Sequence, residues 1–419
     1  MDAGKVLEKM LPGITPSAQE KKDVQAAIDK FTQALKKRLK HARIVVGGSF
    51  AKGTWLRGVH DIDLFVCFNY KRYKDRSNEI SDALQAALNK AGIKHKRLHG
   101  SRDYFEASRG KCSFELIPIL DIKKASQAKN ITDVSPLHAK WVSRKINERL
   151  ADQVRLLKAF CAAQGYYGAE THIKGFSGYV CEILTAKYGS FIAVLRAAEK
   201  WKDKEEIDVE KHYKGRNLIA ELNTSKTQSP LIIIDPVQPD RNAAAALSSD
   251  SFGKFIKAAK QFLKKPTPEF FAEKHTTLED LKRKAKGKEL ITITATPLKG
   301  KRDVVCTKIL KIAECIKKQL AENGFKVLSS GTEWNGNSLI WIMTDGKKPD
   351  SYKVIAGPPL SATEHVKRFR KKHRNTFTKG KKAYAKAKRQ HTDAAELVRS
   401  LIRNDQYIKE RAEKISVND

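Results

Sequence analysis

The chain has 419 residues, of which 82 are Lys or Arg and 47 are Asp or Glu, so its formal net charge is +35. Such an excess of positive charge suits a polyanionic partner such as RNA, although a membrane surface would also fit. No apolar run approaches the roughly twenty residues of a transmembrane helix, and residues 1–11 lack a signal-peptide pattern. We therefore expect a cytoplasmic protein with no membrane segment.

The first informative segment is a glycine pair that follows a short apolar strand. Residues 45–49 read Val-Val-Gly-Gly-Ser, which predicts a strand that ends in a tight turn. Glycines let backbone N–H groups approach a phosphate closely, and the hydroxyl of Ser49 can add a hydrogen bond. Taken alone, such a turn is more often an ordinary loop.

Two aspartates follow on a second predicted strand. Side chains two residues apart on a strand point to the same face, so Asp61 and Asp63 project together while Ile62 points back into the sheet. Adjacent carboxylates repel each other unless a cation lies between them, and Mg²⁺ binds through carboxylates and substrate phosphates. An isolated Asp-x-Asp is usually a surface turn. Its combination with the Gly-Gly-Ser turn favours a metal-dependent nucleotide-transfer site.

A third carboxylate lies on a later predicted strand. Residues 112–120 are mainly apolar and Glu115 is their one charged residue, which predicts a core strand with one embedded acid. In-line displacement with two metal ions needs a ligand that also faces the attacking hydroxyl, and Glu115 is the candidate. Asp121 has the same strand phase and is the fallback. The alternative is a Glu at the sheet edge that reaches solvent or pairs with Lys123.

The middle of the chain is predominantly helical. Between Pro136 and about Tyr188 the apolar residues recur with helical spacing, which predicts a helical neck beside the acids. Residues 231–237 predict a short buried strand and a turn, and residues 252–263 predict another helix. The Lys-rich segment 282–288 is a plausible link between domains.

Residues 289–343 predict a small mixed unit. A strand at 289–296 precedes a helix at 304–323, and two further strands flank an Asn335-Gly336 turn. The order strand, helix, strand, strand resembles a ferredoxin-like or RRM-type fold. Because the aromatic signature of a base-stacking RRM is missing, we expect this unit to hold RNA backbone.

A basic segment follows this unit. Between Lys367 and Arg389 the sequence has no acidic residue, and its lysines and arginines are interleaved with Phe369, Phe377 and Tyr384. Such a segment fits contact with the phosphates of a duplex stem. The alternative is a solvated or disordered basic arm.

Long segments of the chain are similar to archaeal-type (class I) CCA-adding enzymes, the tRNA nucleotidyltransferases that build the 3′-terminal CCA. They begin with GGSFAKGTWLRG and the DID strand, continue through GYYGAETHIKGFSGYVCEIL and DPVQPDRNAAAALS, and end with GPPLSATEHVKRF. The resemblance covers nearly the whole chain.

The resemblance implies roles for the N-terminal residues. Ser49 corresponds to the serine that contacts the nucleotide triphosphate, and Asp61 and Asp63 correspond to two metal-binding acids. Lys52 stands where the family usually has Arg, so a forked phosphate contact is replaced by a point charge. Glu115 stands where the family has Asp, which lengthens the side chain by one methylene and puts the tightness of the metal site in doubt.

Four further residues match positions that hold the incoming nucleotide in the family: His138, Lys158, Tyr167 and Arg241. Each has an ordinary alternative. His138 could be a residue of a helix N-terminus, Lys158 part of a solvated helix face and Tyr167 an aromatic packed in a loop. Arg241 could pair with Asp235 or Asp240.

The expected fold is a multidomain α+β protein. Residues 1–135 would form a nucleotidyltransferase (polymerase β-like) catalytic head, and residues 136–285 a helical neck and nucleotide-binding segment. Residues 286–365 would form a ferredoxin-like, RRM-type body that binds tRNA, and residues 366–419 a basic tail.

The resemblance implies template-independent addition of CCA to tRNA from CTP and ATP, with Mg²⁺ as cofactor and release of pyrophosphate. The expected partner is tRNA, bound at its acceptor stem and 3′ end, and a homodimer is compatible with the family. Two alternatives stay open: a poly(A) or A-adding RNA nucleotidyltransferase, and a catalytically weakened tRNA-binding protein. The second is motivated by Lys52 and Glu115.

Overall fold

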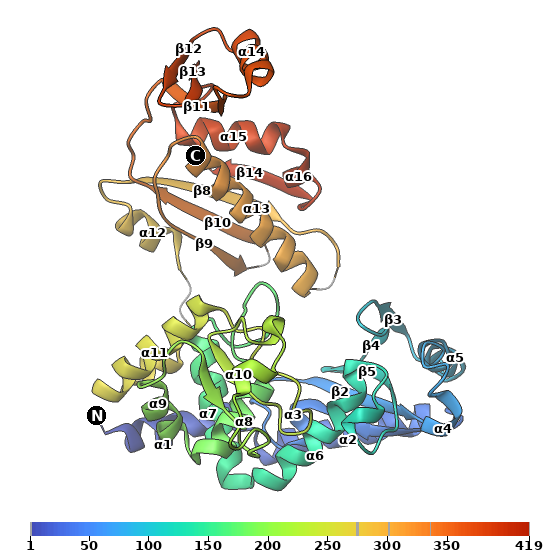
Figure 1. Cartoon of the computed structure of the whole chain (residues 1–419). Coiled ribbons are helices and arrows are strands. Elements are labelled where there is room, and N and C mark those ends of the chain that lie inside the picture. The colour runs from blue at the N-terminus through green and yellow to red at the C-terminus, as the bar shows by residue number, and fades with distance from the viewer. Residues whose placement is uncertain (1, 274–275, 301, 336, 419) are drawn as a thin grey trace. The chain divides into compact units, whose positions relative to one another are not determined.

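The computed structural model describes residues 2–273, 276–300, 302–335 and 337–418 (Figure 1). The chain divides into two compact units, residues 1–274 and 275–419. This division lies inside the segment 136–285 that the sequence predicts as the neck. It precedes the Lys-rich segment 282–288 that the sequence predicts as a link.

The first unit is built on a five-stranded sheet with the strand order β1-β2-β5-β4-β3. Strands β2 (Asp61–Phe68) and β5 (Cys112–Leu120) run parallel at its centre, and the other neighbouring strands are antiparallel. β1 (Ala42–Val46) lies beside β2, while β4 (Tyr104–Arg109) and β3 (His95–Leu98) lie beyond β5. β2 and β5 coincide with the two strands predicted to carry the acids.

Two helices, α2 (Ala18–Lys36) and α5 (Ile80–Lys90), cover one face of this sheet. The hydroxyl of Ser17 caps α2 by accepting a hydrogen bond from the backbone N–H of Glu20 at 3.1 Å. The even-numbered residues of β2, from Ile62 to Phe68, are buried against these helices. Because side chains alternate along a strand, the odd-numbered residues face the opposite side of the sheet.

The rest of the first unit is a helical region with its own apolar core. Its principal helices are α6 (Ser135–Lys145), α7 (Glu148–Ala163), α8 (Gly178–Tyr188), α9 (Phe191–Ala198) and α11 (Ser249–Lys264). α1 (Ala3–Ile14) is first in the chain, yet its apolar face packs into this core through Val6. The parallel pair β6 (Glu205–Ile207) and β7 (Leu231–Ile233) adds Ile207 and Ile233 to it.

Short elements connect these parts. They are α3 (Gly48–Ala51), α4 (Tyr70–Tyr73), α10 (Leu218–Glu221) and the 3₁₀ turns η1 (Ala125–Gln127), η2 (Ile131–Val134), η3 (Thr224–Lys226) and η4 (Pro268–Phe271). Among the described residues, no single helix is long and apolar enough to cross a membrane. α8 and α9 meet the length and composition criteria only as a pair, with a 93° bend between them.

The second unit carries a four-stranded antiparallel sheet with the order β14-β8-β10-β9. Along the chain, β8 (Glu289–Thr296), α13 (Arg302–Glu322), β9 (Val327–Asn335) and β10 (Asn337–Thr344) follow the predicted order. α15 (Ala394–Asn404), α16 (Gln406–Lys409) and β14 (Lys414–Asn418) complete the unit, and α13 and α15 cover one sheet face. Gly336 of the predicted turn lies outside the described residues. α12 (Leu278–Lys284) includes the start of the Lys-rich segment.

The basic segment near the C-terminus folds into a second, smaller sheet. Its strands are β11 (Tyr352–Pro359), β13 (Lys382–Lys388) and β12 (Thr376–Lys379), in that spatial order. α14 (Thr363–Lys372) packs on β11, where a Cβ atom on Gly357 would come within 2.8 Å of the Phe369 ring. The boundary expected at residue 365 falls inside α14, and β11 pairs with a strand from beyond it.

Candidate active site

The Gly-Gly-Ser turn lies directly against strand β2. The backbone N–H of Gly47 donates a 2.7 Å hydrogen bond to the carbonyl of Asp63. A Cβ atom on Gly47 would lie 2.2 Å from the Phe65 ring, and one on Gly48 would lie 1.7 Å from Asp63 Oδ2. Gly48 also has a φ of +56°, which disfavours any residue with a side chain. Both glycines are therefore required to bring the turn, and with it Ser49, close to Asp63.

The three predicted acids share one face of the sheet. Asp63 of β2 is the register partner of Glu115 on β5, and Asp61 is the partner of Ser113. This face is the one opposite α2 and α5. The structure adds a fourth acid that sequence reasoning missed, because Glu106 on β4 is the register partner of Glu115 on its other side.

The electrostatics of Asp63 fit a cation ligand. Burial raises the pKa of Asp63, and the charge of Asp61 raises it further, while Lys52 lowers it. The buried Asp63 carboxylate is thus repelled by Asp61, and Lys52 offsets its negative charge only in part. A bound divalent cation would remove that repulsion.

The carboxylates do not form a complete metal cage. Within the part of the chain that the structure describes, no three His, Cys, Asp or Glu side chains are grouped closely enough to hold a metal ion. Mg²⁺ usually takes only one or two protein carboxylates and completes its shell with water and substrate phosphates. Asp61 and Asp63 therefore suit a Mg²⁺ site in which water and the phosphates of the substrate supply the remaining ligands.

Asp121, the fallback third ligand, is engaged elsewhere. Its two carboxylate oxygens accept hydrogen bonds of 2.7 and 2.9 Å from the Arg43 guanidinium. This fork-shaped pair lies at the end of β5, three alternations beyond Glu115. The geometry leaves Glu115 as the acid next to Asp63.

Lys52 and Lys158 meet at a buried glutamate that sequence reasoning did not single out. Glu182 of α8 accepts contacts from Lys52 Nζ at 2.8 Å and from Lys158 Nζ at 3.1 Å. Its Oε1 also accepts a 2.6 Å hydrogen bond from the Thr54 hydroxyl. Lys158 further donates to the hydroxyl and the carbonyl of Thr54, so its three donors are all used.

These contacts hold the loop that follows the Gly-Gly-Ser turn against the helical region. Arg155 of α7 donates to the carbonyl of Trp55 at 3.0 Å and also to the carbonyl of Gly53. Lys158 donates to the intervening carbonyl of Thr54 at 3.1 Å. Three consecutive carbonyls thus bind cations from α7, which fixes the head relative to the helices.

Tyr167 lies beside this cluster. A Cβ atom on Gly178, the first residue of α8, would come 3.0 Å from the Tyr167 hydroxyl and 3.5 Å from Lys158 Nζ. Burial raises the pKa of Tyr167 well above its usual value, so the phenol stays neutral and can donate a hydrogen bond. Gly178 is the residue that lets the three groups approach.

His138 and Arg241 meet at a second buried carboxylate. Asp235 Oδ2 lies 3.0 Å from His138 Nε2 and 2.6 Å from an Arg241 nitrogen, and Oδ1 accepts from the Tyr179 hydroxyl at 3.2 Å. Burial alone would raise the pKa of Asp235, but His138, the backbone N–H of Val237 and Arg241 lower it to about 2. The ion pair of Arg241 with Asp235, one of the alternatives weighed from sequence, is present.

Tyr179 connects the two clusters. Its ring packs against His138 at 4.5 Å between centroids, and Lys52 Nζ lies 5.3 Å from its centre. The predicted residues therefore form one continuous group from the acids to Arg241. Sequence reasoning missed Tyr179 and Glu182, and it named Asp235 only as an alternative partner of Arg241. A signal existed, since Glu182 interrupts an apolar helix just as Glu115 interrupts an apolar strand.

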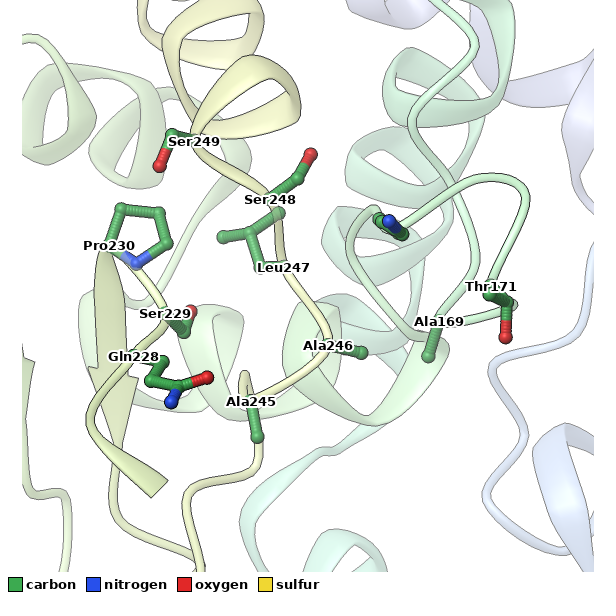
Figure 2. Close-up of a pocket in the computed structure, with 11 residues that line it drawn as sticks. Ala169, Thr171, Gln228, Ser229, Pro230, Ala245, Ala246, Leu247, Ser248 and Ser249 are labelled. Carbon is green, nitrogen blue, oxygen red and sulfur yellow. The ribbon is translucent and has the colours of Figure 1, made fainter. Parts of the chain in front are cut away.

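A pocket of about 380 Å³ opens between three segments of the helical region (Figure 2). None of the predicted site residues lines it; its lining residues are 169, 171, 174, 228–230 and 245–249. A neighbouring pocket of about 400 Å³ shares Ala169, Ala245 and Ala246 with it and includes Arg241. Arg241 thus contacts Asp235 and also lines this second pocket.

Three family models match successive parts of the chain. A nucleotidyltransferase domain matches residues 28–136, and the second domain of tRNA nucleotidyltransferase matches residues 152–272. The C-terminal domain of CCA-adding enzyme matches residues 286–414. The first match covers both strands that carry the acids.

Curated relatives match over most of the chain. The CCA-adding enzyme of Nanoarchaeum equitans is 34% identical over 364 residues, which cover 86% of this chain and 88% of that protein. The CCA-adding enzyme of Methanocaldococcus jannaschii is 31% identical over 415 residues, which cover 95% and 90%.

Solved structures share the fold at much lower identity. A cytoplasmic RNA terminal U-transferase superposes with a TM-score of 0.51 at 16% identity, over 65% of this chain and 98% of that one. The Cid1 poly(U) polymerase gives a TM-score of 0.52 at 16% identity, over 64% and 98%. With the domain match, this likeness shows a nucleotidyltransferase-fold head in a mixed α+β chain.

Proposed function

The chain belongs to the family of CCA-adding enzymes, and we propose that it carries out CCA addition at the acidic face of its first sheet. The matched domains and relatives make it a tRNA nucleotidyltransferase that completes the 3′ end of tRNA. One observation carries the location of the site. Asp61, Asp63 and Glu115 lie on one face of paired strands, with the Gly48 turn against Asp63.

In the proposed reaction, the 3′-hydroxyl of tRNA attacks the α-phosphate of CTP or ATP in line, and pyrophosphate leaves. Asp61 and Asp63 would hold Mg²⁺, which when bound neutralises charge on the triphosphate and the attacking oxygen. Glu115, the neighbour of Asp63, helps to place the hydroxyl. Ser49 donates its hydroxyl to a phosphate oxygen, and Lys52 offsets phosphate charge.

The helical region would complete the nucleotide site. His138, Tyr179 and Arg241, joined through Asp235, present ring and guanidinium donors for the base, the ribose and the acceptor end. Tyr167 keeps a neutral phenol available for a phosphate or a sugar. Since the donors of Lys158 are used within the protein, we assign it a supporting charge behind Lys52.

The second unit would hold the tRNA. Its larger sheet has the strand order β14-β8-β10-β9 with two helices on one face, the arrangement of a ferredoxin-like body. On the smaller sheet, Lys382, Tyr384 and Lys386 alternate with buried alanines and share a face with Phe377. Phe377 and Tyr384 stack at 5.6 Å between centroids. Lysines beside exposed aromatic rings suit contact with RNA phosphates and loops.

The same observations bear on the two alternative functions, an A-adding nucleotidyltransferase and a tRNA-binding protein with weakened catalysis. The poly(U) polymerase and U-transferase likenesses concern the fold alone, so they carry no preference for A-tailing. Both aspartates and the Gly48 turn are present, which argues against a binding protein that has lost catalysis.

Single-turnover addition of CMP to a tRNA that lacks its CCA end tests the site. We expect Asp61→Asn and Asp63→Asn each to slow addition by about 10³-fold or more, because each removes a charge that holds Mg²⁺. Affinity for tRNA should stay within about twofold, because binding of the polyanion depends on lysines elsewhere. Addition within tenfold of wild type in both variants would overturn the assignment.

A further inference from the structure

Glu182 is a buried acid in contact with Lys52, a candidate phosphate-binding residue. Its side chain is 1% exposed, and it comes from α8 in the helical region rather than from the head. Its two carboxylate oxygens are divided between two lysines, with Oε2 at 2.8 Å from Lys52 and Oε1 at 3.1 Å from Lys158. The carboxylate therefore ties Lys52, at the end of α3, to the helical region.

The charges explain why this acid stays ionised. Burial by itself would raise the pKa of Glu182, but the charges of Lys158 and Lys52 and the hydrogen bonds from Lys52 and Thr54 lower it. Two lysines against one carboxylate leave one positive charge in excess. Lys158 is 2% exposed and Lys52 is 12% exposed, so the excess charge is presented through Lys52.

Two contacts fix the position of Lys52 Nζ. Glu182 holds it at 2.8 Å, and the centre of the Tyr179 ring lies 5.3 Å away. Lys52 ends the short helix α3 that begins at Gly48, whose Cβ position lies 1.7 Å from Asp63 Oδ2. A lysine is a point charge on a flexible stem, and it loses rotamer freedom when it binds a phosphate. A carboxylate that already holds the ammonium group removes that cost before the nucleotide arrives.

We propose that Glu182 is a positioning residue for nucleotide binding: it holds the Lys52 ammonium group at the end of the α3 segment that contacts Asp63, where the triphosphate of CTP or ATP binds. This inference rests on the proposed function. It adds to that function an acid from the helical region that touches no substrate and acts through Lys52. It also explains how Lys52 can hold a fixed position for phosphate binding although it lacks the planar, forked guanidinium group of an arginine.

A double-mutant cycle tests the proposal. KM and kcat for CTP are measured on tRNA that lacks CCA, using wild type, Glu182→Gln, Lys52→Met and the double variant. We expect Glu182→Gln to raise KM for CTP about tenfold with kcat changed less than about threefold, because the contact acts before and during the reaction. In the Lys52→Met background the same substitution should change KM less than about twofold.

Asp133→Asn provides the matched control. Asp133 is also a fully buried, ion-paired carboxylate of the first unit, but its partner is Arg102 at the far end of β5. This variant should lower the melting temperature while KM for CTP stays at the wild-type value. If Glu182→Gln behaves like Asp133→Asn, or raises KM equally with and without Lys52, Glu182 is only structural and the proposal fails.

Two further measurements keep the outcome decisive. If Glu182→Gln does not fold, Glu182→Asp keeps the charge but withdraws it by one methylene, and it should show the same selective rise in KM. A wild-type KM in Glu182→Asp would overturn the proposal.

Equilibrium dialysis of CTP in the presence of Ca²⁺ measures nucleotide binding without the transfer reaction. A wild-type protein that binds CTP but adds no CMP would refute the proposed function, whereas an unchanged CTP affinity in Glu182→Gln would refute this inference.

Discussion

Gly48 leaves no room for a side chain beside Asp63, because a Cβ atom at Gly48 would lie 1.7 Å from Asp63 Oδ2. The backbone of the Gly-Gly-Ser turn is therefore packed directly against Asp63, a candidate metal ligand. The turn is held there by the 2.7 Å hydrogen bond from Gly47 N–H to the carbonyl of Asp63. Any atom added at this point displaces the turn or the carboxylate.

Substitution of Gly48 by alanine should abolish nucleotide addition while the protein stays folded. The new methyl group would push Asp63 out of line, and a displacement of about 1 Å in such sites costs about 100-fold or more in rate. Gly92→Ala is the matched control, since Gly92 also has a positive φ of +65° but has open space around its Cβ. Both variants should lose about 1 kcal/mol of stability from left-handed strain, and only Gly48→Ala should lose activity. Equal losses of activity would show that the clash does not matter.

Replacement of Glu115 by glutamine should lower kcat for CMP addition by about 10²-fold, because it removes the charge beside Asp63 to which we assign placement of the attacking hydroxyl. Asp121→Asn should change kcat by less than about twofold, since Asp121 is paired with Arg43. Rapid-quench assays of both variants decide between the two acids. A larger effect at Asp121 would reverse the assignment of the third ligand.

The Asp235 cluster should give a measurable pH dependence of stability. The pKa of Asp235 is lowered from 3.8 to about 2 in the folded protein. Its contribution to the free energy of unfolding is therefore complete above pH 4, about 2 kcal/mol, and is lost as the pH falls through about 2. Urea unfolding at pH 5.5 and pH 3 measures it.

Comparison with Asp235→Asn isolates that contribution from other carboxylates. The wild type should lose about 1 kcal/mol more than the variant between the two pH values. At pH 5.5 the variant should also be less stable outright, because Arg241 and His138 lose the carboxylate charge that both contact. Parallel losses in both proteins would mean that Asp235 is not ionised in the way described.

The basic face of the smaller sheet should govern the salt dependence of tRNA binding. Lys382→Glu/Lys386→Glu should weaken binding and reduce the slope of log affinity against log salt by about 2, one for each phosphate contact removed. Lys21→Glu/Lys22→Glu makes the same change of charge on α2 of the first unit and should leave the slope unchanged. Filter binding at four salt concentrations suffices, and equal slopes for all three proteins would exclude this face.

The sequence predicted the elements that carry chemistry because their patterns are local. Alternation placed Asp61 and Asp63 on one strand face, and the apolar run around Glu115 predicted the neighbouring strand. The register that pairs Asp63 with Glu115 is not local, since it depends on which strands become neighbours in the sheet. The same holds for Glu106, whose place beside Glu115 is set by an antiparallel pairing.

The contacts around Glu182 could not be predicted from the sequence for a similar reason. Lys158 looks like part of a solvated helix face, yet it is 2% exposed because Glu182 and Thr54 satisfy all its donors. Glu182 lies 130 residues from Lys52 along the chain, so their contact follows only from the packing of the head on the helices. Patterns within one element do not contain that information.

Strand pairing in the basic segment argues against one of the alternatives that composition left open. Composition fitted a phosphate-contacting surface, with a solvated or disordered basic arm as the alternative. In the structure, Ala383 and Ala385 are buried while the intervening side chains are turned outward, so the lysines are held on one sheet face. The alternation was visible in the sequence Lys-Ala-Tyr-Ala-Lys, and it is a strand pattern.

The most direct test of the account follows extension of three tRNA transcripts that end before the first C, after one C and after both C residues. Wild type and Asp61→Ala/Asp63→Ala are incubated with Mg²⁺ and labelled CTP and ATP. We predict that wild type completes every transcript to CCA and stops there, and that the double variant adds nothing while it still binds tRNA. Tails of A without limit, tRNA binding without addition by wild type, or unchanged addition by the double variant would contradict the account.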